Sequence, residues 1–282
     1  MPRLTSLVLE KLYSLIGFKP VRYRVYSVLY SSGILEVVNR WFNDNCTDLD
    51  LREFVLNSKA VSKSQLQQDL LVAYLTEVKN LRFCNQKSES QRFFVEFGAA
   101  DGITLSNTFL LEKQYGWDGI LCEPAQVWRE DLLRNRKCHI DFRIVYPATN
   151  RTLIFSETVQ PEFSFVNDLA SREESDQPRK SSKIYNVTSV TLEELLNSYG
   201  APKQIDYLSI DTEGGELEII RSFDFTRWQV GIITIEHNYR SDREEIYQIL
   251  SNHGFSRILD GVSSWDDWYL NNEFVNRNIL QN

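Results

Sequence analysis

The sequence predicts an α/β fold built on a Rossmann-like, mostly parallel sheet of seven strands with an antiparallel C-terminal edge. From Arg92 onward, apolar stretches of strand length alternate with stretches of helical periodicity. The strand candidates are almost continuously apolar, which is typical of a parallel sheet covered on both faces. Shorter helical segments precede this alternation, so we expect an N-terminal helical extension over residues 1–60 and a main domain over residues 61–282.

The elements of the main domain follow from the same patterns. A helix is expected over residues 66–81, with Ser62 or Ser64 as its cap. Apolar runs predict strands over residues 93–97, 119–122, 139–145, 187–190, 205–210, 230–236, 255–259 and 268–270. Helical periodicity predicts helices over residues 105–115, 125–135, 191–198, 213–223 and 242–252, with Thr191 as the cap of the third. The polar stretch 157–186 predicts either a mobile loop or lid over the active site or a disordered insertion.

Composition narrows the class of protein. The formal charge of −8 and the pI near 5.1 argue against nucleic acid as a partner, because binding a phosphate backbone requires a dense basic surface. The four cysteines are far apart and form no Cys-x-x-Cys pair, so we expect reduced thiols. No apolar run reaches the length of about 20 residues that a transmembrane helix needs, and no signal peptide is evident. A cytoplasmic protein is therefore expected.

The N-terminus differs in charge from the rest of the chain. Residues 1–40 hold six Lys or Arg residues against two Glu, interleaved with apolar side chains. Such a segment could lie as an amphipathic helix on a membrane surface. Alternatively, its apolar stripe could pack on the main domain or on a partner chain, which would suit a homodimer. Both interpretations stay open.

A small-residue turn follows the first strand of the alternating region. Glu96 is followed by the run Phe97-Gly98-Ala99-Ala100-Asp101-Gly102. A nucleotide-like ligand can approach the backbone of this run closely, because most of its side chains are small. About one strand–helix unit later, Glu123 ends the next strand, where Rossmann-type sites place an acid that accepts hydrogen bonds from ribose hydroxyls. Together the turn and the acid predict a cofactor site at the carboxyl ends of these strands.

The charges of the turn indicate which cofactor. An NAD site has the fingerprint Gly-x-Gly-x-x-Gly to receive a pyrophosphate, whereas this turn has fewer glycines and carries Asp101. S-adenosylmethionine has no phosphate and bears a sulfonium and an ammonium group, which suit Glu96 and Asp101. The sequence favours a methyl donor over a nicotinamide.

Further motifs occur in a fixed order along the chain. They are Ser64–Asp69 (SQLQQD), Phe94–Gly102 (FVEFGAADG), Ser106–Thr108 (SNT), Leu111–Glu112, Gly116–Gly119 (GWDG), Glu123–Pro124 and Ile205–Glu216 (IDYLSIDTEGGE). This series resembles the motifs of the FkbM family of methyltransferases over roughly residues 62–272. The resemblance implies a class I methyltransferase sandwich and an S-adenosylmethionine-dependent O-methyltransferase. The cofactor-binding residues expected from the turn, the acid and the resemblance are Glu96, Gly98, Ala99, Asp101, Gly102, Ser106, Asn107, Glu123, Pro124 and Asp211.

Candidate bases follow two later strands. Removal of the proton of an acceptor hydroxyl would fall to Asp211, Glu213, Glu236 or His237, all at or just after strand ends. His237 is attractive because neutral imidazole accepts a proton near pH 7, although an isolated histidine is as often a packing residue. Asp211 and Glu213 could also hold Mg²⁺, whereas a Glu213 that only favours a helix N-terminus needs no metal.

The acceptor itself is not encoded in a motif. The resemblance places a sugar or glycan hydroxyl first, and a polyketide or other small metabolite second. Two rivals to the methyltransferase remain, a nicotinamide-dependent oxidoreductase and a non-catalytic S-adenosylmethionine-binding scaffold.

Overall fold

The computed structural model of the chain describes residues 46–59, 61–86, 90–159, 161, 164–166, 181–212 and 214–276. The expected N-terminal amphipathic helix, with its membrane contact or dimer interface, lies outside the described residues, as does Glu213. The boundary at residue 60 stays a prediction. Helix α4 (Leu49–Ser58) buries Leu51 and Val55 in one apolar cluster with Leu70 and Tyr74, so its residues share a core with the segment that follows.

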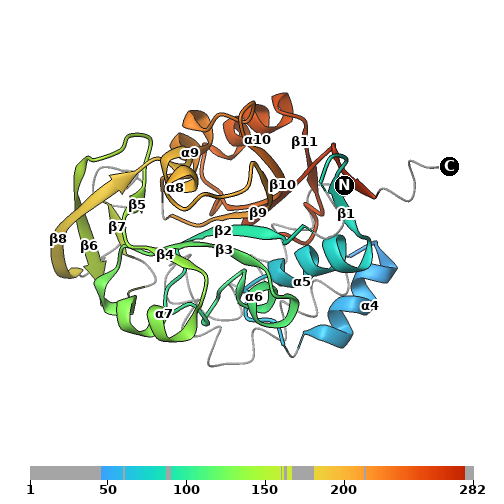
Figure 1. Cartoon of the computed structure of the whole chain (residues 1–282), viewed down its shortest axis with the longest axis horizontal. Coiled ribbons are helices and arrows are strands. Elements are labelled where there is room, and N and C mark those ends of the chain that lie inside the picture. The colour runs from blue at the N-terminus through green and yellow to red at the C-terminus, as the bar shows by residue number, and fades with distance from the viewer. Residues whose placement is uncertain are drawn as a thin grey trace, which may run out of the picture.

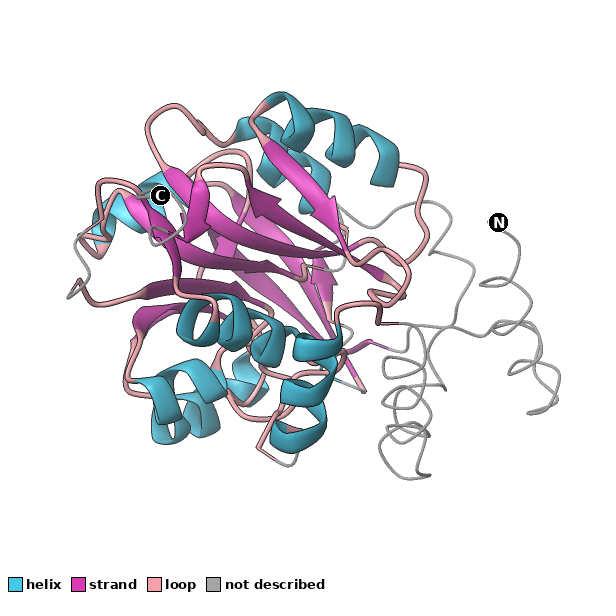
Figure 2. Cartoon of the chain, turned by 90° about the vertical axis from the view of Figure 1, so that its right-hand side faces the viewer, coloured by secondary structure: helices cyan, strands magenta, loops and turns pink. Residues whose placement is uncertain are grey.

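A seven-stranded sheet forms the centre of the molecule (Figures 1 and 2). Its strand order is β11 (Phe255–Ile258), β12 (Asp266–Asn271), β10 (Gln229–Glu236), β9 (Gln204–Ile210), β2 (Phe93–Phe97), β3 (Asp118–Cys122) and β4 (His139–Asp141). The pairs β10–β9, β9–β2, β2–β3 and β3–β4 are parallel, and β12 pairs antiparallel with both of its neighbours. The predicted Rossmann-like fold with seven strands and a C-terminal antiparallel hairpin is confirmed.

Helices cover both faces of this sheet, as the apolar strands predicted. Helices α8 (Leu192–Ser198), α9 (Glu216–Ser222) and α10 (Arg243–Asn252) lie on one face, and α5 (Gln68–Ala73), α6 (Phe109–Tyr115) and α7 (Arg129–Asn135) on the other (Figure 1). Side chains alternate along β2 to serve both layers. Phe93 and Val95 are buried with α8 and α9, whereas Phe94 is buried with Leu111 of α6 and Leu132 of α7.

Several helix boundaries differ from the expected ones. Helix α6 begins four residues later than predicted, because Leu105 has a φ of 60° and Ser106 Oγ accepts the N–H groups of Thr108 and Phe109. The helix expected over 125–135 is a 3-10 turn, η2 (Gln126–Trp128), followed by α7. The helix expected over 66–81 is α5 followed by a π-helical turn, η1 (Tyr74–Val78). Thr191 caps α8 as predicted.

A second sheet flanks the β4 side of the first. It comprises β5 (Ile144–Val145), β8 (Ser181–Val190), β6 (Thr152–Thr158) and β7 (Phe165–Val166), in that order. The single strand expected over 139–145 is therefore two strands, β4 and β5, in different sheets. The prediction of a loop over residues 157–186 is wrong at both ends, because β6 extends to Thr158 and β8 begins at Ser181. These strands bury apolar side chains in a separate small core around Leu153, Phe155, Val166 and Val187.

The remaining strands, β1 (Leu81–Phe83) and β13 (Phe274–Asn276), form an antiparallel pair that joins the C-terminal end to the segment before the main sheet. Within the described part of the chain, no helix has both the length and the apolar character that crossing a bilayer requires.

Candidate functional site

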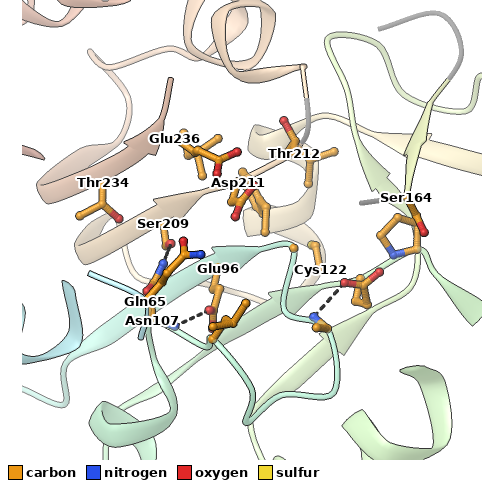
Figure 3. A pocket seen from close by; sticks show the side chains of 18 of the residues that line it. Gln65, Glu96, Asn107, Cys122, Ser164, Ser209, Asp211, Thr212, Thr234 and Glu236 are labelled. Atoms are coloured by element: carbon orange, nitrogen blue, oxygen red, sulfur yellow. Dashed lines mark hydrogen bonds between the residues drawn. The ribbon is translucent and has the colours of Figure 1, made fainter. Parts of the chain in front are cut away.

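A pocket opens at the carboxyl ends of β2, β3, β9 and β10 (Figure 3). In open parallel sheets this edge is where ligands bind, because the loops that follow the strands leave a crevice there. Of the residues predicted for the site, those that line the pocket are Glu96, Gly98, Asn107, Glu123, Pro124, Asp211 and Glu236. The sheet β6–β7 adds Phe155 and Phe165 to its wall.

The glycine turn brings the backbone of two strands together at the floor of the pocket. Gly98 has a φ of +75°, and a Cβ at that position would lie 2.4 Å from the carbonyl oxygen of Asp211. The N–H of Gly98 donates to the carbonyl oxygen of Cys122 at 3.0 Å. Any side chain at Gly98 would therefore push β2 away from the end of β9.

Glu123 closes the turn from the neighbouring strand. Its carboxylate accepts the N–H of Ala100 at 2.9 Å and the N–H of Ala125 at 2.8 Å. Burial raises the pKa of Glu123 to about 7, and these two hydrogen bonds oppose the shift only in part. The pocket therefore contains a buried acid at the position where the sequence predicted a contact with a ribose.

Glu96 organises the loop that leads into α6. Its carboxylate accepts hydrogen bonds from Ser106 Oγ, the N–H of Asn107 and Thr108 Oγ1. Burial raises the pKa of Glu96, and the Arg136 guanidinium, 3.8 Å away, opposes that effect. Most of the hydrogen-bonding capacity of Glu96 is thus used within the protein, which fixes the position of Asn107.

Asn107 presents an unsatisfied acceptor to the pocket. Its Nδ2 donates to Ser209 Oγ at 2.9 Å, whereas its buried Oδ1 accepts no hydrogen bond from the described residues. A buried amide oxygen that accepts no hydrogen bond costs free energy. Asn107 Oδ1 can therefore accept a hydrogen bond from a donor group of a ligand.

Two carboxyl groups meet on the other side of the glycine turn. Asp211 hydrogen-bonds Glu236, and its pKa is raised by burial and, second, by the negative charge of Glu216. Asn238 Nδ2 donates to Glu236 Oε2 at 2.6 Å. Figure 3 shows the Asp211 and Glu236 side chains next to each other at the pocket wall. A hydrogen bond between two carboxyl groups requires a shared proton, so this pair can take up or release a proton near neutral pH.

Glu216 holds the loop that carries Asp211. One of its oxygens accepts the N–H groups of Thr212 and Gly214 at 3.0 and 3.2 Å, and the other accepts a hydrogen bond from Arg240. The helix expected over 213–223 begins only at Glu216, and the described residues 211, 212, 214 and 215 are in a loop.

His237 directly follows β10 and is not among the residues that line the pocket. Its Nδ1 accepts the N–H of Tyr239 at 2.9 Å, and its Nε2 lies 3.8 Å from Asp267 Oδ1. Burial and the charge of Arg243 lower its pKa to about 4. The alternation of side chains along the strand therefore puts His237 away from the position that the sequence predicted.

Four of the predicted cofactor residues support the pocket from outside its lining. They are Ala99, Asp101, Gly102 and Ser106. The Asp101 carboxylate accepts the N–H groups of Ile103 and Thr104 and so caps its own turn. A Cβ on Gly102 would lie 2.6 Å from Arg136 Cγ.

The polar lining residues that were not predicted as site residues include Gln68, Ser209, Thr234 and Asp266. In the sheet register, Ser209 is opposite both Glu96 and Thr234, and Asp266 is opposite Glu236. For Ser209 and Thr234 the signal in the sequence is a polar side chain within a mostly apolar strand.

The described residues contain no group of three or more His, Cys, Asp or Glu side chains arranged to hold a metal ion. A Mg²⁺ site at Asp211 therefore has no support from the other described ligands, and Glu213 lies outside the described residues.

The sheet order and the position of the pocket fit the Rossmann-like α/β fold of class I methyltransferases. A family model described as "Methyltransferase FkbM domain" matches residues 96–257, over half of the chain. The chain therefore belongs to the FkbM family of methyltransferases.

Solved structures with similar folds include other methyltransferases. An FkbM methyltransferase from Methylobacillus flagellatus KT is 11% identical, with 87% of this chain and 60% of that protein covered and a TM-score of 0.38. This chain thus spans less than two thirds of that protein's length. An O-methyltransferase from Bacillus cereus, solved with SAH, is 12% identical, with 83% and 96% covered and a TM-score of 0.40. A search of curated proteins found no match. The family match, rather than these loose overlaps, carries the assignment.

Proposed function

We propose that this methyltransferase uses S-adenosylmethionine to methylate a hydroxyl group, with a sugar or glycan as the acceptor. The observation that carries the proposal is the buried carboxylate of Glu123 beside the Gly98 turn, in a chain that belongs to a methyltransferase family. Glu123 would accept the ribose hydroxyls, and the turn allows the ligand to approach the backbone.

The two ends of the pocket suit the two ends of this cofactor. Ile144, Val145 and Phe155 form an apolar wall near Glu123 that would receive the adenine ring. On the opposite side, the unsatisfied Asn107 Oδ1 and the carboxyl group of Asp211 would receive the ammonium group. The residues present therefore fit S-adenosylmethionine.

When bound, S-adenosylmethionine would supply an electrophilic methyl group for the acceptor oxygen. The protein's contribution is to orient the acceptor and accept its proton. Asp211 and Glu236 would take that proton, because they line the pocket and already share a hydrogen bond. Asn238 keeps Glu236 directed at the pocket through its bond to Oε2.

A hydroxyl acceptor suits the polar lining beyond Asp211. Gln65, Gln68, Ser209 and Thr234 all line this region, and their amide and hydroxyl groups can both donate and accept, as hydroxyl groups require. No step in this mechanism needs Mg²⁺.

Isothermal titration of the protein with S-adenosylmethionine, S-adenosylhomocysteine and NAD tests the cofactor assignment. Saturable binding of the first two, without binding of NAD, is expected. Binding of NAD alone would replace the proposal with an oxidoreductase. Binding of S-adenosylhomocysteine without turnover on any hydroxyl acceptor would favour a scaffold.

A further inference from the structure

Three carboxyl groups stand in a row across the carboxyl ends of neighbouring strands. Asp211 directly follows β9, Glu236 ends β10, and Asp266 begins β12. In the antiparallel register Glu236 and Asp266 are direct partners, so they point to the same side of the sheet. All three line the pocket. Like charges directly opposite each other destabilise a sheet, so packing alone does not account for this row.

Asp266 and its neighbour Asp267 show that the row is specific to the pocket face. Asp267 faces the other side, where Arg243 and Arg257 approach it at 2.6 and 3.3 Å. Asp266 forms no ion pair with any described cation, and its exposed fraction is 5%. Its side-chain partner in the pocket is Gln68, whose Nε2 donates to Asp266 Oδ2 at 2.7 Å.

Gln68 is held so that it keeps a donor for the pocket. Its Oε1 accepts the N–H of Leu66 at 2.8 Å, which fixes the orientation of the amide. The amide nitrogen carries two hydrogens, and the bond to Asp266 uses one of them. Gln68 and Asp266 together therefore present one donor and one acceptor side by side.

The lining of the pocket lacks positive charge. Among the described residues that line it, none is Lys, Arg or His, although it includes the carboxylates Glu96, Glu123, Asp211, Glu236 and Asp266. A phosphate or carboxylate on the acceptor would enter a site with like charge and no cation to pair with, which costs free energy.

We infer that Gln68 and Asp266 form the acceptor-specificity element of this enzyme, binding a second hydroxyl of the acceptor and excluding acceptors that carry an anionic group near the reacting hydroxyl. This inference rests on the proposed function, because the acceptor must enter the end of the pocket beyond Asp211. Asp211 and Glu236 then accept the proton of the reacting hydroxyl. Gln68 and Asp266 bind the second hydroxyl of the same acceptor.

The test compares matched acceptors at pH 8 by measuring the release of S-adenosylhomocysteine. One series contains neutral methyl hexopyranosides and the other contains the corresponding methyl hexuronosides and hexose 6-phosphates. For the wild type, we expect kcat/KM for the neutral series to exceed that for the anionic series by about tenfold or more. In Asp266→Asn the ratio should fall to about threefold or less, because a repelling charge is removed.

Two further variants separate selectivity from folding. Asp267→Asn alters the adjacent carboxylate on the other face and should keep the wild-type ratio. Gln68→Met should weaken both series equally, because it removes the donor and leaves the charge of Asp266. Titration with S-adenosylhomocysteine is run on the wild type and on every variant. If the wild type does not bind S-adenosylhomocysteine, the proposed function itself is overturned. If the wild type binds S-adenosylhomocysteine, three results would overturn the inference. The wild type could turn over the anionic acceptors as well as or better than the neutral ones, or not turn over the neutral series at all. The ratio of kcat/KM between the two series could also stay unchanged in Asp266→Asn.

Discussion

Acidic side chains are buried at both ends of the central strands, but they differ in whether a cation pairs with them. At the amino end, Asp206 of β9 is fully buried and pairs with Arg92 at 3.0 Å, while also accepting the N–H of Phe93 at 2.9 Å. At the carboxyl end, Glu123 and Asp266 are buried and Asp211 is half-buried, and none of the three forms an ion pair with a described cation. Burial raises the pKa of all these acids, and at Asp206 the charge of Arg92 opposes it most strongly.

This difference distinguishes structural acids from functional ones. A buried ion pair is satisfied within the protein, and removing one partner leaves a buried charge alone. A buried acid that lacks a cation lowers stability and is expected where a ligand will satisfy it. The amino end should therefore control stability, and the carboxyl end should control binding and turnover.

The largest effect is expected at the carboxyl pair. Glu236→Gln should lower kcat by about 10²–10⁴-fold, the usual contribution of a general base, and leave the melting temperature close to that of the wild type. Steady-state turnover and a thermal melt measure the two quantities. His237→Gln, at the next residue but outside the lining of the pocket, is the matched control. A larger loss of kcat in His237→Gln than in Glu236→Gln would return the role of base to the histidine.

At the amino end, Asp206→Ala should reduce the free energy of unfolding by about 3–5 kcal/mol, because Arg92 loses its buried partner. Chemical denaturation measures this change. Asp266→Asn provides the contrast at the carboxyl end, since it removes an acid without a cation partner and should cost much less. Equal losses of stability in both variants would contradict the distinction between the two ends.

Binding should depend on Glu123 more than on Asp101. Glu123→Ala should weaken the binding of S-adenosylhomocysteine by about 10–100-fold, as expected for hydrogen bonds to a charged group. Asp101→Ala should weaken it less, because its carboxylate caps the turn rather than lining the pocket. Calorimetric titration of both variants checks the order. Wild-type affinity in both would remove the assigned cofactor site.

The smallest effect is a pH dependence set by Glu123. Its pKa is about 7 in the folded protein against an ordinary value of 4.5, so the folded state binds the proton more tightly. The free energy of unfolding without ligand should fall as pH rises from about 4.5 through 7. Affinity for S-adenosylhomocysteine should rise over the same range by at most about tenfold per pH unit, because ribose hydroxyls favour the carboxylate. Glu123→Gln should flatten the affinity profile and reduce the slope of the unfolding profile, to which Asp211 and Asp266 still contribute because their pKa is also raised to about 7.

Sequence patterns predicted the central sheet well, because buried parallel strands leave an unambiguous apolar signal, as in residues 205–210. They failed over residues 157–186, where the ends of β6 and β8 are mostly polar and are held by pairing with each other. The positions of the Gly98 turn and Glu123 could be predicted from the sequence, because the carboxyl ends of neighbouring parallel strands lie at the same edge of the sheet. His237 was misplaced and Asp266 was missed because the face that a side chain occupies depends on strand register, which one sequence does not reveal.

The most direct test of the central claim is a crystal structure of the protein with S-adenosylhomocysteine. The claim predicts both ribose hydroxyls within hydrogen-bonding distance of the Glu123 carboxylate, and the amino group of the ligand beside Asn107 Oδ1 and Asp211. A ligand bound elsewhere, or a ribose that contacts none of the pocket's acids, would contradict the claim that these buried carboxylates mark the functional site.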